Sequence, residues 1–90
     1  MGPRIKLFAH LRTIRPRLNG FIIQHTVDNA LFLVGNRNVS DMRLAFELGV
    51  IHNQLNLGQD EVGTSDEAMP HLRAIEDAME AIKIWLREVA

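Results

Sequence analysis

The residues from Gly35 to Ser40 are the ones best suited to binding an anion. They read Gly-Asn-Arg-Asn-Val-Ser and lie between an apolar stretch and a predicted helix start. A helix N-terminus presents free N–H groups and the positive end of the helix dipole, so a phosphate or carboxylate could bind there. Arg37 would supply charge, and Asn38 and Ser40 would supply hydrogen-bond donors. The same residues also suit the simpler task of ending one helix and capping the next, which we favour.

The first 18 residues form a basic segment with no acid. Its cations are Arg4, Lys6, Arg12, Arg15 and Arg17, whereas residues 44–90 hold nine acids and three cations. Arg12 and Arg15 complete the candidate anion site, and aligned cations here could also contact nucleic-acid phosphates. However, the net charge of the chain is -1, and it has one Trp and no Tyr for base stacking. We therefore argue against nucleic acid and expect the basic and acidic segments to pair with each other.

Four histidines, at positions 10, 25, 52 and 71, are the best candidates for a metal site. Their spacing contains no H-x-x-x-H or H-E-x-x-H pattern, and the chain has no cysteine. Two ligands such as Glu67 and His71, four residues apart, do not make a zinc site. We predict neither a metal nor a cofactor.

The segment from Asp41 to Gly49 raises the question of catalysis. It follows an apolar run and a Gly-Asn-Arg turn, and it resembles the strand-loop-helix that delivers a catalytic glutamate in nucleoside deoxyribosyltransferases. The resemblance implies that Glu47 is a nucleophile. It covers a short part of the chain, and no parallel strands can be read on either side of it. No other catalytic motif is present, so we predict a non-enzymatic protein.

The C-terminal residues 69–89 give the clearest helix prediction. Apolar side chains recur at alternating steps of three and four residues, which is a heptad seam. Such a seam can join two copies of the chain or pack within one copy. The candidate interface between copies consists of Leu72, Ile75, Met79, Ile82, Trp85 and Leu86.

Residues 40–57 form the second predicted helix, and with 69–89 they make a C-terminal helical hairpin. Ser40 or Asn38 supplies the N-cap, and Gly58 suits the position just past the C-terminus. Residues 59–63 would then form an acidic loop. The pattern Thr-Ser-Asp-Glu that begins at Thr64 indicates a short turn over 65–68 that leads into the last helix.

The N-terminal half can be interpreted in two ways. A short first helix interrupted at Pro16 is favoured by its Leu, Ala, Arg and Lys content. Residues 21–34 form either a helix running from an Asn19 cap to Gly35 or a β-hairpin that turns at Asp28-Asn29. We favour the helix, because an isolated hairpin is barely stable. The sequence thus predicts an all-α bundle of three to four helices, with an α+β fold as the alternative.

The size and composition of the chain set the functional expectation. Its 90 residues, 47% of them hydrophobic, fit a single domain over 1–90. It has no apolar run of the roughly 18 residues that span a membrane, and no secretory signal, so we expect a cytoplasmic protein. A chain this short buries little surface and often gains stability by self-association. We expect an interaction or regulatory protein that binds a protein partner and acts as a homo-oligomer, a dimer or higher. The alternative is a binder of a small phosphorylated or nucleotide-like anion.

Overall fold

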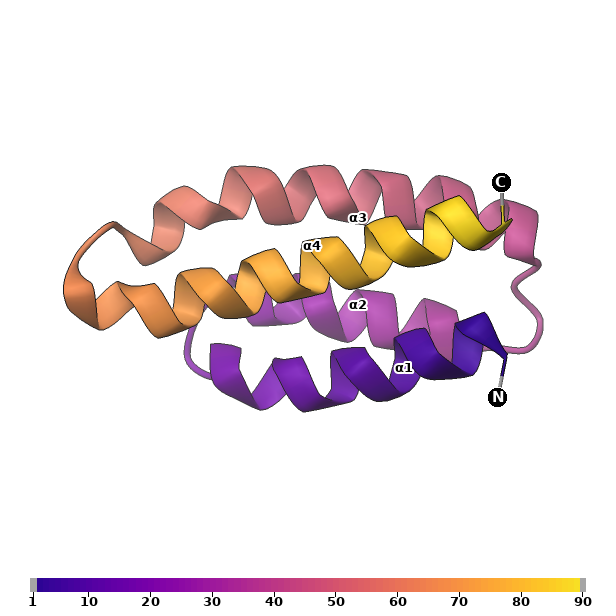
Figure 1. Ribbon diagram of the computed structural model, residues 1–90, viewed down its shortest axis with the longest axis horizontal. Helices are drawn as coiled ribbons and strands as arrows, with labels where there is room; N and C mark the ends of the chain where they lie inside the picture. The colour runs from indigo at the N-terminus through magenta and orange to yellow at the C-terminus, as the bar shows by residue number, and fades with distance from the viewer. Residues whose placement is uncertain (1, 90) are drawn as a thin grey trace.

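The four α-helices in residues 2–89 follow one another along the chain, and each reverses the direction of the one before (Figure 1). The computed structural model describes residues 2–89. Helix α1 spans Pro3–Ile14, α2 spans Ile23–Gly35, α3 spans Asp41–Val62 and α4 spans Met69–Val89. The short 3-10 segments η1 (Arg15–Leu18) and η2 (Asp66–Ala68) continue α1 and precede α4. The resulting bundle measures 38 × 20 × 19 Å.

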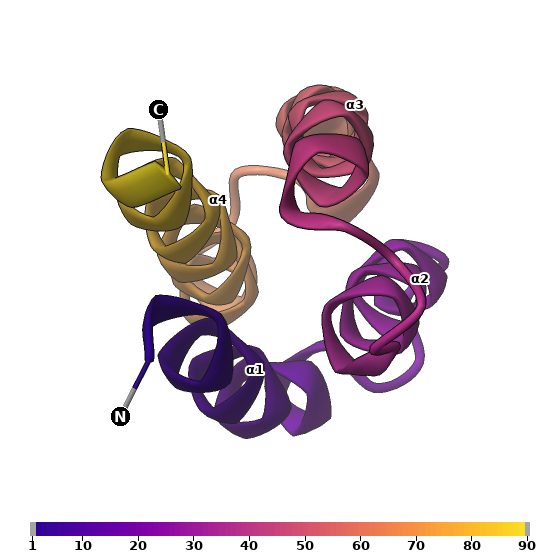
Figure 2. The ribbon, with the colours of Figure 1, turned by 90° about the vertical axis from the view of Figure 1, so that its right-hand side faces the viewer.

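The helices form a closed ring around one core (Figure 2). Helices that are adjacent in sequence pack side by side, and α4 returns to pack against α1. Each helix turns one apolar stripe toward the centre, as in other four-helix bundles. On α3 this stripe consists of Leu44, Leu48, Ile51 and Leu55, all of them buried. The all-α prediction is therefore confirmed, as is the C-terminal helical hairpin.

Residues 23–35 are helical, so the alternative β-hairpin is wrong. Ile23, Val27, Ala30 and Val34 recur at helical spacing and are all buried against the other helices. Asp28 and Asn29, the residues of the proposed turn, lie in the middle of α2. The helix is favoured because α1 and α3 pack on either side of α2 and bury its apolar stripe, whereas a lone hairpin has no sheet to join.

The predicted ends of α2 need correction. The helix begins at Ile23 instead of following an Asn19 cap, because the chain first turns at Gly20, which has a φ of 91°. Gly35 is the last helical residue and not the residue beyond it. A Cβ at Gly35 would lie 3.0 Å from the Phe8 ring, so this glycine lets α1 approach α2 closely.

Helix α3 continues past Gly58, and the acidic loop predicted at 59–63 is helical up to Val62. Gly58 has a packing role instead, since a Cβ there would collide with the Cδ1 atom of Ile23 in α2. The helix stops at Gly63, whose φ of 86° favours glycine. The extra turn carries Glu61 to the start of α2. Ser40 caps α3 as predicted, and the predicted turn over 65–68 is η2, capped by Ser65.

Candidate interaction surface

The connection between α2 and α3, where the sequence suggested an anion site, is occupied by a side chain of α1. The Arg4 guanidinium donates hydrogen bonds to the carbonyl oxygens of Leu33, Val34, Asn36 and Val39 at 3.2, 2.9, 2.7 and 2.7 Å. It also pairs with the Asp41 carboxylate at 3.1 Å. A cation at a helix C-terminus satisfies exposed carbonyls and complements the helix dipole. Arg4 therefore holds α1, α2 and α3 together and has few donors left for a ligand.

The five predicted anion-binding residues are not brought together at one site. The Ser40 hydroxyl accepts a hydrogen bond from the Arg43 N–H at 3.2 Å, which is a capping role. The Asn38 backbone N–H donates to the Asn36 side chain at 3.0 Å. The Arg12 guanidinium lies 5.9 Å from the centre of the Phe8 ring. The exposed Arg37 side chain forms no ion pair within residues 2–89.

The fifth residue, Arg15, is engaged with α2. It donates a hydrogen bond to the Asp28 carboxylate. This bond holds the pKa of Asp28 below its ordinary value of 3.8, and the same bond raises the pKa of Arg15. Arg17 pairs with Asp77 at 2.9 Å, which confirms for this pair that the basic and acidic segments face each other across the fold.

Helix α2 is also held at its other end. The two carboxylate oxygens of Glu61 accept hydrogen bonds from the backbone N–H groups of Ile22 and Ile23 at 2.6 and 3.0 Å. The next two N–H groups, of Gln24 and His25, donate to carbonyls three residues back. All four N–H groups at this helix start thus have acceptors, although no local side chain caps it.

The heptad seam of α4 lies largely inside the single chain. Ile75, Ile82 and Trp85 are 0, 0 and 2% exposed, because the seam packs between α1 and α3. Leu72, Met79 and Leu86 are half-buried. Packing within one copy therefore buries three of the six predicted interface residues and partly covers the other three.

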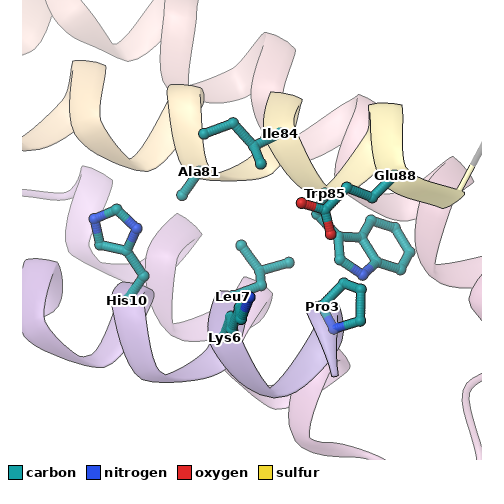
Figure 3. A pocket seen from close by; sticks show the side chains of 8 residues that line it. All are labelled: Pro3, Lys6, Leu7, His10, Ala81, Ile84, Trp85 and Glu88. Atoms are coloured by element: carbon teal, nitrogen blue, oxygen red, sulfur yellow. The ribbon is translucent and has the colours of Figure 1, made fainter. Parts of the chain in front are cut away.

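A shallow groove of about 190 Å³ runs between α1 and α4. Figure 3 shows Lys6 and His10 on one wall and Glu88 on the other, with Leu7 and Trp85 between the two helices. Pockets that enclose small organic ligands usually measure roughly 300–1,000 Å³. This groove is too small and too open to be a convincing ligand site.

A larger hollow of about 520 Å³ lies between the start of α1 and the end of α2. Ile5, Phe8 and Val34 give it apolar walls, and Arg4 and Arg37 add charge. Since Arg4 is already bonded to backbone carbonyls, Arg37 is the cation with donors to offer here.

Helix α3 carries a second apolar stripe that faces away from the core. We call it the α3 outer stripe; it consists of Met42, Phe46, Val50 and Leu57, which are 85, 72, 44 and 68% exposed. Met42 and Phe46 each precede a core leucine by two residues, and two residues turn a helix by about 200°. The outer stripe therefore lies opposite the core stripe. Figure 2 shows α3 at a corner of the bundle, where no other helix covers that side.

Gly49 lies within this outer stripe and has no packing role within residues 2–89. A Cβ at this position would meet nothing within 4 Å. Glycine in a helix interior costs about 0.5–1 kcal/mol relative to alanine. At Gly58 this cost is offset because the missing side chain lets Ile23 pack against α3. Gly49 gains no such contact within residues 2–89. A partner that approaches α3 closely from outside would account for it.

The spacing of the outer-stripe residues can be read from the sequence, but their exposure on the surface of the bundle cannot. Met42, Phe46 and Val50 are spaced four residues apart, and Leu44, Leu48 and Ile51 form a separate series two residues out of step. Two interleaved apolar series in one helix indicate two apolar faces. Only the packing of α3 shows which of the two series is buried and which is exposed.

The segment before Asp41 is a helix, where the resemblance to the deoxyribosyltransferases requires a strand. The apolar run before Asp41 is helix α2, and residues 2–89 contain no strand, so the resemblance that would make Glu47 a nucleophile fails in its fold. In the part of the chain that the structure describes, no three His, Asp or Glu side chains gather as a metal site requires. Between residues 2 and 89, no helix is long and apolar enough to cross a lipid bilayer.

The fold and this surface define a small four-helix bundle with one helix that is apolar on two opposite sides. Comparison with protein-family models, with curated proteins and with solved structures gives no match to the chain.

Proposed function

We propose that this chain is a non-enzymatic interaction protein that binds another protein through the α3 outer stripe. The observation that carries the proposal is the exposure of Met42, Phe46 and Leu57 at 85, 72 and 68% on one side of one helix. Single exposed apolar residues are ordinary, but an aligned set on one helix is typical of a surface that a partner covers. A partner helix that lies along α3 would bury these side chains together.

Binding by such a surface should depend on its large central side chain. Phe46→Gln keeps the bundle core intact, because Phe46 makes little contact with it, and removes the aromatic group that a partner would cover. Phe32→Gln is a matched control, since Phe32 is 67% exposed on α2. We expect tagged wild type and Phe32→Gln to retain the same bound proteins from the source cell and Phe46→Gln to lose them. Equal recovery by all three proteins would contradict the proposal.

A photo-cross-linking residue can locate the contact directly. Placed at position 46, it should yield a cross-linked product that the same residue at position 32 does not give. Circular dichroism of each variant checks that the helices remain. If position 32 cross-links as well as position 46, binding does not centre on α3.

The second candidate function is capture of a small amphipathic anion in the hollow near Arg37. It rests on the apolar walls of that hollow and on the one cation there that has no side-chain partner among residues 2–89. Ligand bound to the folded state raises the melting temperature. A nucleotide and organic-phosphate panel should then stabilise wild type and Arg43→Ala but not Arg37→Ala, with the effect weakened by salt. No shift with any compound would remove this candidate.

A further inference from the structure

We propose that the protein that covers the α3 outer stripe is a second copy of this chain, with the two α3 helices antiparallel. This inference rests on the proposed function and specifies its partner. The stripe runs from Met42 to Leu57, so its midpoint lies between Gly49 and Val50. A two-fold axis at that point places Met42 of each copy against Leu57 of the other. Each end of the stripe is then covered by an apolar side chain of the second copy.

The glycine at the midpoint fits this arrangement. Around the two-fold axis, Gly49 of one copy faces Val50 of the other, and a position without a Cβ lets the helices approach. Among residues 2–89 a Cβ at Gly49 would meet nothing within 4 Å, so close packing against a second helix is the contact that would use this glycine. A smaller residue at the centre and larger residues toward the ends allow the two faces to interdigitate.

The charges beside the stripe favour the antiparallel direction. Arg43 lies beside its N-terminal end and Asp60 lies one turn past Leu57, and both are exposed. Neither forms an ion pair within residues 2–89. With the axis between Gly49 and Val50, Arg43 of one copy lies opposite Asn56 of the other, and Asp60 of that other copy follows one helical turn further on. Parallel helices would instead set like charges side by side. The helix dipoles also oppose each other in the antiparallel arrangement.

The contact is modest in size. Residues 42–57 extend over about 24 Å of helix, which places the interface near the small end of specific contacts. We therefore expect a dimer that dissociates in the micromolar range and is seen only at the higher concentrations used in light scattering. The mass should rise from 10.2 kDa toward twice that value as concentration increases.

Single cysteines can test the geometry without interference, because the chain has none of its own. Val50→Cys lies next to the axis and should oxidise to a covalent dimer about tenfold faster than Phe32→Cys, since dimerisation raises the local thiol concentration. A mixture of Met42→Cys and Leu57→Cys should form the mixed disulfide in preference to either self-linked product. Self-linked Met42→Cys as the main product would overturn the antiparallel arrangement.

Charge exchange and mass determination complete the test. Arg43→Glu and Asp60→Arg should each weaken the dimer, and the double variant should recover most of the loss; no recovery would overturn the pairing. A wild-type mass that stays at 10.2 kDa at every concentration would overturn self-association itself. In that case a position-46 cross-link to a different protein would still support the proposed function, so the two proposals fail separately.

Discussion

Arg4 and Glu61 bind opposite ends of the same helix, α2, although they belong to α1 and α3. The guanidinium of Arg4 lies at the C-terminal carbonyls of α2, and the carboxylate of Glu61 lies at its N-terminal N–H groups. Each charge has the sign that the adjacent end of the helix dipole attracts. Helix α2 has no side-chain cap of its own at its start, so its ends are completed by its neighbours.

Arg4→Ala should destabilise the fold by about 2 kcal/mol, because several carbonyls lose a charged donor. Arg4→Lys should recover only part of this loss, since one ammonium group cannot replace a planar fork of five N–H donors. Urea unfolding followed by circular dichroism measures both. Arg12→Ala is the control, as Arg12 only stacks near Phe8, and it should cost less than about 1 kcal/mol. An Arg4→Lys variant as stable as wild type would contradict the capping role.

Glu61→Ala should cost about 1 kcal/mol, the usual effect of removing a helix N-cap. Glu61→Gln should fall between wild type and Glu61→Ala, because an amide keeps one acceptor oxygen but loses the negative charge. Asp60→Asn changes the charge of the neighbouring exposed residue and should leave monomer stability nearly unchanged. Urea unfolding at low protein concentration gives the free energy of unfolding of each variant. If Asp60→Asn and Glu61→Gln lowered it equally, the loss of negative charge and not the loss of the cap would explain the effect.

The Arg15–Asp28 pair predicts a loss of stability in acid. The folded protein lowers the pKa of Asp28 below 3.8, so the unfolded chain takes up this proton at a higher pH than the folded chain does. The stabilising contribution is therefore complete above the ordinary pKa and disappears as pH falls through the lower, folded-state value. Unfolding free energies from about pH 5.5 down to about pH 2.5 should decline more for wild type than for Asp28→Asn. If the free energy of unfolding declined equally for both proteins, the Arg15–Asp28 pair would not contribute to acid sensitivity.

Two glycines of α3 should respond to alanine with opposite signs. Gly49→Ala should stabilise the monomer by about 0.5–1 kcal/mol, because alanine favours a helix and the new Cβ meets nothing. Gly58→Ala should destabilise it by about 1 kcal/mol or more, because the new Cβ collides with the buried Ile23 side chain. Chemical unfolding at low protein concentration measures both. Stabilisation by both variants would mean that Ile23 moves aside without cost.

Local patterns in the sequence were sufficient to predict the helices of the C-terminal half. Ser40 and Ser65 cap the segments that directly follow them, and the α4 seam repeats within a single helix. Each of these features depends on residues a few positions apart, so composition and spacing contain the necessary information.

The features that the sequence did not reveal depend on distant residues. Arg4 bonds to groups 29 to 37 positions along the chain, and Glu61 to N–H groups 38 and 39 positions away. A glycine such as Gly58 often follows the end of a helix, but here it lies inside α3 and makes room for the Ile23 side chain. Only the packing of α2 against α3 reveals this role. Of the predicted anion-site residues, Ser40 was correctly given a capping role, and Arg15 was not expected to pair with Asp28.

The external capping of α2 also determines how this helix can open. A helix that supplies its own caps can fray at its ends while the rest of the fold stays intact. The N–H groups of Ile22 and Ile23 are released only when α2 separates from Glu61 of α3. Amide hydrogen exchange at these two positions should thus be far slower than is usual for a first helical turn. The bundle should open there as a cooperative unit, with α2 losing its structure only together with its neighbours.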